Sequence, residues 1–122
     1  MTALLIIAHG SPRPEANEDI RKIAQLIRER GRWDLVAIGY LDCNAPDIAT
    51  AIDECVAGGV TELAVVPYFL HTGKHLLRDI PDALKLAAGR HRSLTITLGS
   101  HLGRQPEIIQ VLRDRYLAAK MR

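Results

Sequence analysis

Apolar residues follow two alternating patterns along this chain. Short apolar runs bounded by turn residues predict buried strands, and longer segments with apolar residues three or four positions apart predict amphipathic helices. The predicted strands cover residues 4–8, 35–40, 63–66 and 94–98, and the predicted helices cover 15–30, 46–58, 81–88 and a segment that begins at Pro106. The last strand alternates apolar and polar residues, which predicts a half-covered edge strand.

The resulting βαβαβαβα order predicts an α/β fold built on one four-stranded parallel sheet. Right-handed crossovers between parallel strands place helices on both faces of such a sheet. The 122 residues suit one domain, and no linker interrupts them, so we expect a single domain over residues 1–122. The simplest strand order is 2-1-3-4, in which ligands bind beyond the carboxyl ends of strands one and three, where the winding reverses.

Composition excludes several classes of protein. Apolar residues make up 48% of the chain and charged residues 25%, as in a globular protein, and the net charge is only +2. With one Trp, one Phe and three Tyr there is little to stack bases on, so we expect no nucleic-acid partner. Cys43 and Cys55 fit neither a disulfide framework nor a zinc ribbon. The apolar run 3–8 is too short for a signal peptide or membrane span, so we expect a cytoplasmic protein with no membrane partner.

Histidines follow the two strands at the predicted switch point. His9 comes directly after the first strand, and His71 and His75 follow the third. Gly10 permits a positive φ or a close approach to a ligand, and Ser11 offers a short polar contact. The predicted topology therefore brings His9 and His75 to one site.

The chemistry of imidazole suits such a site. It binds Co, Ni, Fe and Zn ions, and its ordinary pKa of about 6.5 lets it accept protons near neutrality. Two histidines and a nearby carboxylate such as Asp42 would leave coordination positions open, which favours transfer of a metal over its storage. For His91, between a helix and a strand, we expect a structural role.

Two motifs resemble those of a known family. The first is Ala-His-Gly-Ser at residues 8–11, after an apolar strand, and the second is Val-Val-Pro-Tyr-Phe-Leu at 65–70, followed by Gly73, His75 and Asp-Ile-Pro at 79–81. Over nearly the whole chain the sequence resembles the small class II chelatases of the CbiX and SirB type, which insert a divalent metal into sirohydrochlorin. The resemblance implies a single-lobe, chelatase-like (flavodoxin-like) fold with His9 and His75 as the active-site histidines. It also makes Asp42 the counterpart of an acidic residue, commonly Glu, in relatives.

The resemblance leads to a hypothesis about mechanism. His9 and His75 would hold the metal, and one or both would accept the pyrrole protons with Asp42 assisting. No permanently bound cofactor is needed because the metal ion (Co²⁺, Fe²⁺ or Ni²⁺) is a substrate. Sirohydrochlorin carries many carboxylates, so a cationic rim is expected. The candidate substrate-binding residues are Ser11, Arg13, Lys74, Arg78 and Arg104. Because longer relatives carry two such lobes, a homodimer would restore the two-lobed body.

Two other functions remain open at this point. A non-enzymatic metal carrier or binding module could use the same histidines. Histidine-dependent phosphoryl transfer is a weaker alternative, because Ala8 stands where histidine phosphatases have a phosphate-binding arginine. The sequence does not choose among cobalt, iron and nickel, nor among cobalamin, siroheme and nickel-tetrapyrrole pathways.

Overall fold

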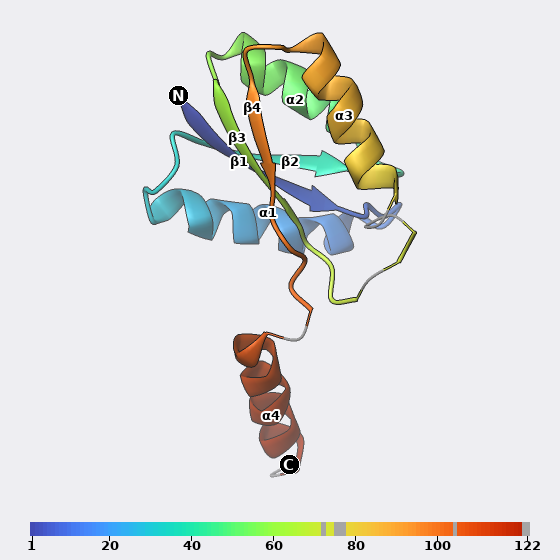
Figure 1. Ribbon diagram of the computed structural model, residues 1–122. Coiled ribbons are helices and arrows are strands. Elements are labelled where there is room, and N and C mark those ends of the chain that lie inside the picture. Colours follow the sequence, from blue (N-terminus) through green and yellow to red (C-terminus); the bar gives the residue numbers. More distant parts are fainter. Residues whose placement is uncertain (72, 75–77, 104, 121–122) are drawn as a thin grey trace.

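The computed structural model is built on one parallel sheet of four strands in the predicted order, β2-β1-β3-β4 (Figure 1). It describes residues 1–71, 73–74, 78–103 and 105–120. The elements in chain order are β1 (Thr2–Ala8), α1 (Pro14–Glu29), β2 (Leu35–Tyr40), α2 (Ile48–Ala57), β3 (Glu62–Pro67), α3 (Ile80–Arg90), β4 (Thr95–Leu98) and α4 (Pro106–Lys120). Among the described residues, no helix combines the length and apolar character needed to cross a membrane.

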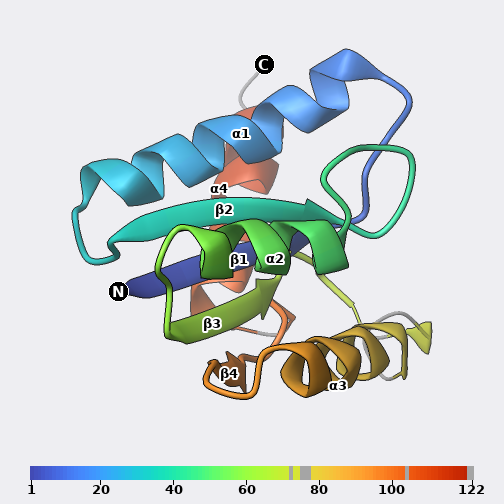
Figure 2. The ribbon, with the colours of Figure 1, turned by 90° about the horizontal axis from the view of Figure 1, so that it is seen from above.

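The central strand β1 is buried on both faces, as its unbroken apolar sequence predicts. Leu5 and Ile7 point into a core that β1 and β3 share with α2 and α3. Leu4 and Ile6 point to the other face, where they pack with Ile20 of α1 and its neighbours. Figure 1 shows α1 on one side of the sheet and α2 and α3 on the other, and in Figure 2 α2 lies over β1 and β2 while α3 lies beside β4.

Proline, aspartate and glycine set the helix boundaries. Pro14 opens α1, one residue ahead of the predicted start, and Gly31 follows the helix with a φ of 68°, a left-handed conformation that favours glycine. At the start of α2, the Asp47 carboxylate accepts a hydrogen bond of 2.8 Å from the Thr50 backbone N–H. This bond lowers the pKa of Asp47.

The fourth βα unit departs from the expected arrangement. Thr95 and Thr97 of β4 are exposed, so the half-covered edge strand is confirmed. The helix that follows it, α4, has no buried residue and lies apart from the sheet in Figure 1. Helices on both faces are therefore confirmed for α1, α2 and α3, but α4 covers neither face of its own sheet.

Candidate functional site

Backbone hydrogen bonds join the three segments that leave the carboxyl ends of β1, β2 and β3. The carbonyl of Ile7 accepts a bond of 2.8 Å from Tyr68 N–H, the carbonyl of Ala8 accepts one of 3.0 Å from Leu41 N–H, and the carbonyl of His9 accepts one of 3.0 Å from Asp42 N–H. The structure therefore brings His9 and Asp42 together through their backbones, at the predicted edge of the sheet.

Gly10 is required by the packing of these loops. Its φ is 92°, and a Cβ atom built there would lie 2.0 Å from the backbone oxygen of Asp42. A side chain at this position would separate the loop after β1 from the loop after β2. Of the two possibilities that the sequence left open at Gly10, a positive φ and a close approach to a ligand, the structure shows the positive φ. The close approach that it shows is to the neighbouring loop.

Two asparagines that the sequence analysis did not single out hold the loop after β1. The Ser11 backbone N–H donates a bond of 2.7 Å to Asn44 Oδ1, and the Ser11 carbonyl accepts one of 2.9 Å from Asn17 Nδ2. Among the described residues, Asn17 is the one buried polar residue, at 6% exposed. The sequence does carry a signal that Asn17 is buried: it lies three residues before Ile20 and seven before Ala24, on the apolar stripe of α1.

Ser11 and Asp42 both make hydrogen bonds within their own loops. Ser11 Oγ accepts the backbone N–H of Arg13 at 3.1 Å, which helps to turn the chain into α1. The Asp42 carboxylate is exposed and accepts the N–H of Cys43 at 2.8 Å, where Cys43 has a φ of 65°. Contact of Ser11 with a substrate, and of Asp42 with a metal, stay predictions.

The imidazole of His9 is exposed and lies against the aromatic segment after β3. Its ring meets Phe69 edge to face, with centroids 6.5 Å apart and an interplanar angle of 81°. Phe69 is in turn packed against the core shared with α2 and α3. A surface hollow opens beside His9, lined by residues 8–11, by Ala16, Asn17, Asp19 and Ile20 of α1, and by Tyr68 and Phe69.

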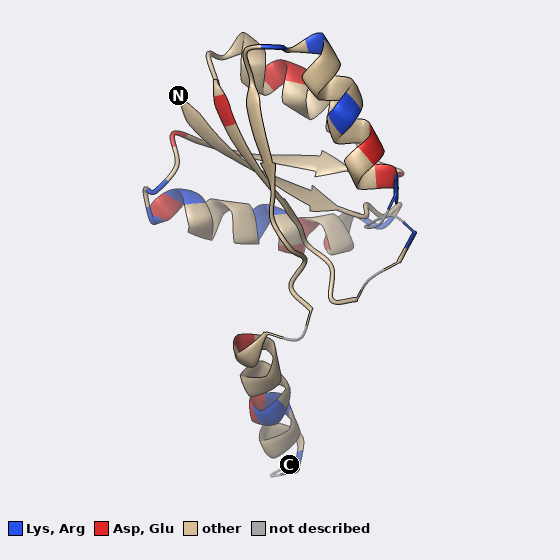
Figure 3. Cartoon of the chain, in the orientation of Figure 1, with Lys and Arg blue, Asp and Glu red and all other residues tan. Residues whose placement is uncertain are grey.

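The remaining predicted site residues lie partly outside the described residues. His75 and Arg104 fall outside them, so their predicted roles rest on the sequence. Arg13, Lys74 and Arg78 are exposed. Figure 3 shows both cationic and acidic positions in the loops at this end of the sheet and at the start of α3. Within the described residues, no three His, Cys, Asp or Glu side chains are grouped closely enough to hold a metal ion.

His91 lies elsewhere, at the end of α3. Its Nε2 atom is 2.6 Å from Asp53 Oδ1 of α2, and Arg90 is 3.1 Å from the same oxygen. These contacts lower the pKa of Asp53, chiefly through the hydrogen bond with His91. The contact with α2 accords with the structural role expected for His91.

The fold and the exposed histidine define a class of protein. The protein has a doubly wound parallel α/β sheet, and in such sheets ligands bind at the switch point, where His9 lies between β1 and β3. The chain belongs to the CbiX family, whose model matches residues 3–119.

Relatives and solved structures define the similarity further. The chain is 40% identical over 86 residues to a sirohydrochlorin cobaltochelatase of Methanococcus aeolicus, a match that covers 70% of this chain and 60% of that protein. It is 34% identical to a sirohydrochlorin cobaltochelatase of Methanothermobacter thermautotrophicus, over 95% of this chain and 91% of that protein.

The structural comparison leads to the same family. The crystal structure of the sirohydrochlorin chelatase SirB from Bacillus subtilis subspecies spizizenii, in complex with cobalt, matches with a TM-score of 0.90 and 29% identity. That match covers 96% of this chain and 50% of SirB. The chain thus spans about half of SirB and less than two thirds of several relatives that it matches.

Proposed function

We propose that this chain is a sirohydrochlorin chelatase, a lyase that inserts a divalent metal ion into sirohydrochlorin. The family match over residues 3–119 carries the proposal. The names of the relatives in Methanococcus aeolicus and Methanothermobacter thermautotrophicus support sirohydrochlorin as the substrate and Co²⁺ as the metal. Fe²⁺ and Ni²⁺ are the alternatives, because imidazole binds all three ions well.

In the proposed mechanism, His9 and His75 bind the partly desolvated metal ion. As the metal passes from the imidazoles into the ring, one or both histidines accept the protons that the pyrrole nitrogens lose. The exposed imidazole of His9 supports this role, because a large macrocycle needs an accessible group. Its contact with Phe69, the close packing of Gly10 on the Asp42 backbone and the hydrogen bond from Ser11 to Asn44 fix the loop on which the imidazole stands. Asp42, beside His9 in the next loop, would assist the proton transfer.

The substrate carboxylates would bind at the rim of this site. Arg13, Lys74 and Arg78 are exposed on the segments that join β1 to α1 and β3 to α3, which supports their pairing with carboxylates. Arg104 and Ser11 complete the proposed set. The metal leaves with the product, so the protein needs no permanently bound cofactor.

The proposal extends to assembly and location. A homodimer would give this chain, which spans half of SirB, a second lobe. We place the protein in the cytoplasm, since its two cysteines, Cys43 exposed and Cys55 buried, are both free thiols.

The experiment that tests the function follows sirohydrochlorin absorbance after Co²⁺ is added, with and without the purified protein. We expect turnover above the uncatalysed rate, and a fall of about 100-fold or more in the His9→Ala, His75→Ala double variant, as loss of general base catalysis predicts. His91→Ala is the matched control, because it removes an imidazole outside the site. A double variant as active as wild type would contradict the proposed mechanism.

The same assay separates the chelatase from a metal carrier. A chelatase turns over and binds the free metal weakly, whereas a carrier binds it tightly and shows no turnover. Calorimetry with Co²⁺ alone, beside rates measured with Co²⁺, Fe²⁺ and Ni²⁺ under anaerobic conditions, distinguishes the two functions. Tight binding of Co²⁺ without turnover would favour the carrier.

A further inference from the structure

The helix α4 carries an apolar stripe that its own chain leaves uncovered. Ile108, Leu112 and Tyr116 stand four residues apart on one side of the helix, with Ile109 beside them. Leu112 is 65% exposed and Tyr116 62% exposed. Because an isolated helix of this length is only marginally stable in water, the stripe calls for a packing partner.

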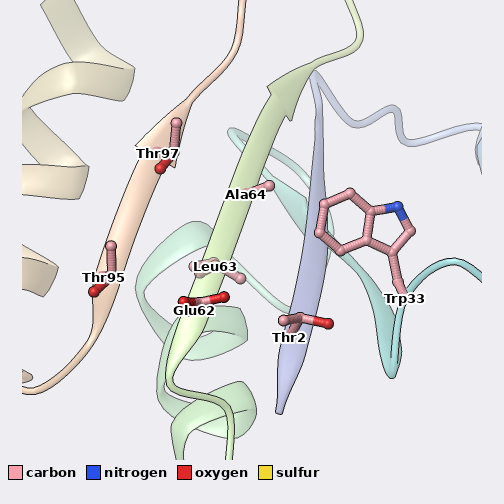
Figure 4. A pocket seen from close by; sticks show the side chains of 7 residues that line it. All are labelled: Thr2, Trp33, Glu62, Leu63, Ala64, Thr95 and Thr97. Carbon is pink, nitrogen blue, oxygen red and sulfur yellow. The ribbon is translucent and has the colours of Figure 1, made fainter.

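One part of the sheet lacks a covering helix, just as α4 lacks a surface to pack on. On the face that carries α1, a shallow hollow runs over β3 and β4, lined by Ala64 and Glu62 of β3, Thr95 and Thr97 of β4, and the ring of Trp33 (Figure 4). The apolar cluster beneath α1 is centred on β1 and β2 and reaches β3 only at the partly buried Ala64 and Val66, so the area over β3 and β4 beside it is open. A parallel sheet is normally covered on both faces, so the hollow has the position of a missing helix.

The chain directs α4 away from this hollow. After β4, the Gly99 N–H bonds to the carbonyl of Val65 at 2.8 Å, and the Leu102 N–H bonds to the carbonyl of Phe69 at 3.0 Å. These bonds continue the path of β4 along β3 and past the end of the sheet. A right-handed crossover would return α4 to the face of β3 and β4. Here α4 instead lies beyond the end of the sheet (Figure 1).

We propose that two copies of this chain exchange their α4 helices, so that the stripe of each helix packs on the β3–β4 hollow of the other copy. One chain carries both an unpartnered helix and the sheet surface that lacks a helix, so a second copy satisfies both surfaces in a closed two-fold arrangement. The inference specifies the interface of the homodimer proposed above and rests on that part of the proposed function.

The exchange would also connect the dimer to the site. The crossing segment is bonded at Leu102 to Phe69, whose ring meets the imidazole of His9. A helix that crosses from this point brings the second copy to the open end of the sheet, next to His9. A large macrocyclic substrate would then meet both copies.

The test uses the single tryptophan of the chain, because Trp33 lines the hollow. We expect light scattering to give a dimer, and the Trp33 emission to shift to longer wavelength on dilution as the partner's helix leaves. Leu112→Glu should raise the dimer dissociation constant by at least about 30-fold, as at an interface hot spot, and keep the emission red-shifted. Gln110→Glu, which puts the same charge on the other side of α4, is the control and should remain a dimer.

A mixing experiment identifies the exchange itself. Leu112→Glu damages the helix and leaves the hollow intact, whereas Thr97→Glu damages the hollow and leaves the helix intact. Each variant alone should be a monomer with wild-type circular dichroism, and an equimolar mixture should form heterodimers by native mass spectrometry, because one undamaged helix still meets one undamaged hollow. A dimer formed between two α4 helices would not recover on mixing, and this result would overturn the exchange.

Two further outcomes would contradict the inference. A wild-type monomer with Trp33 emission independent of concentration would mean that no second copy covers the hollow. A dimer that persists in the Leu112→Glu variant would place the interface elsewhere. If Thr97→Glu fails to fold, the Leu112→Glu variant alone still tests the interface. An active monomer would overturn the exchange and leave the chelatase function standing, whereas an exchanged dimer without turnover would overturn the chelatase function alone.

Discussion

The two faces of the sheet are completed to different extents. On one face, α2 and α3 cover the strands with a continuous core that contains Leu5, Ile52 and Val65, all fully buried. On the other face, α1 covers β1 and β2, while the part over β3 and β4 is open beside Trp33. The same βα repeat therefore gives a closed layer or an open one, depending on where the chain goes after the strand.

The largest expected effect is a difference in the free energy of unfolding between two isoleucine variants. One isoleucine is buried under the closed face, and the other is exposed on α4. Ile52→Ala should lower the free energy of unfolding by about 2–5 kcal/mol at every protein concentration, because it removes methyl groups from a packed core. Ile109, which is 58% exposed, should cost within about 0.5 kcal/mol when replaced by Ala in the monomer. In the exchanged dimer its cost should grow with protein concentration.

Urea unfolding of both variants at two protein concentrations measures this difference. Equal losses at Ile52 and Ile109, at both concentrations, would show that α4 is packed in its own chain as α2 is. The two faces of the sheet would then be equally closed within one chain.

The next effect concerns the polar end of the half-covered face, where α1 begins. Asn17→Ala should lower stability by about 1–3 kcal/mol, because it leaves the Ser11 carbonyl without its donor. We also expect a lower chelatase rate, since the loop that carries His9 loses one of its two asparagine anchors. The measurement is the unfolding midpoint together with the cobalt insertion rate.

A second amide on α1 gives the control for Asn17. Gln25 lies on the exposed side of the helix, where its side chain accepts a bond of 3.2 Å from Arg28. Gln25→Ala should change stability by less than about 0.5 kcal/mol and leave the rate unchanged. If the two alanine variants behaved alike, Asn17 would have no positioning role.

Sequence reasoning succeeded where the fold depends on local patterns. Apolar runs and helical stripes were sufficient for the four strands, their order and the place of His9 at the switch point. The path of α4 could not be predicted, because its stripe shows that the helix packs on something without showing on which copy. The hydrogen bond between Asn44 and the Ser11 backbone joins residues 33 positions apart, and the bond from Asn17 to the Ser11 carbonyl depends on how the loop turns into α1. The steric demand at Gly10 comes from the backbone of Asp42.

The smallest effect concerns the contact that joins the two helices of the closed face. Hydrogen bonds from His91 and Arg90 depress the pKa of Asp53 below its ordinary value of 3.8. A depressed carboxyl pKa contributes stability above the unfolded-state pKa, and this contribution is lost as the pH falls through the folded-state pKa. Asp53→Asn should therefore be slightly less stable than wild type at pH 7, and the gap should narrow below about pH 4. Urea midpoints at both pH values measure the gap, with Glu54→Gln on the same helix as the control. A gap that stays constant into acid would mean that the carboxylate charge of Asp53 does not stabilise the contact between α2 and α3.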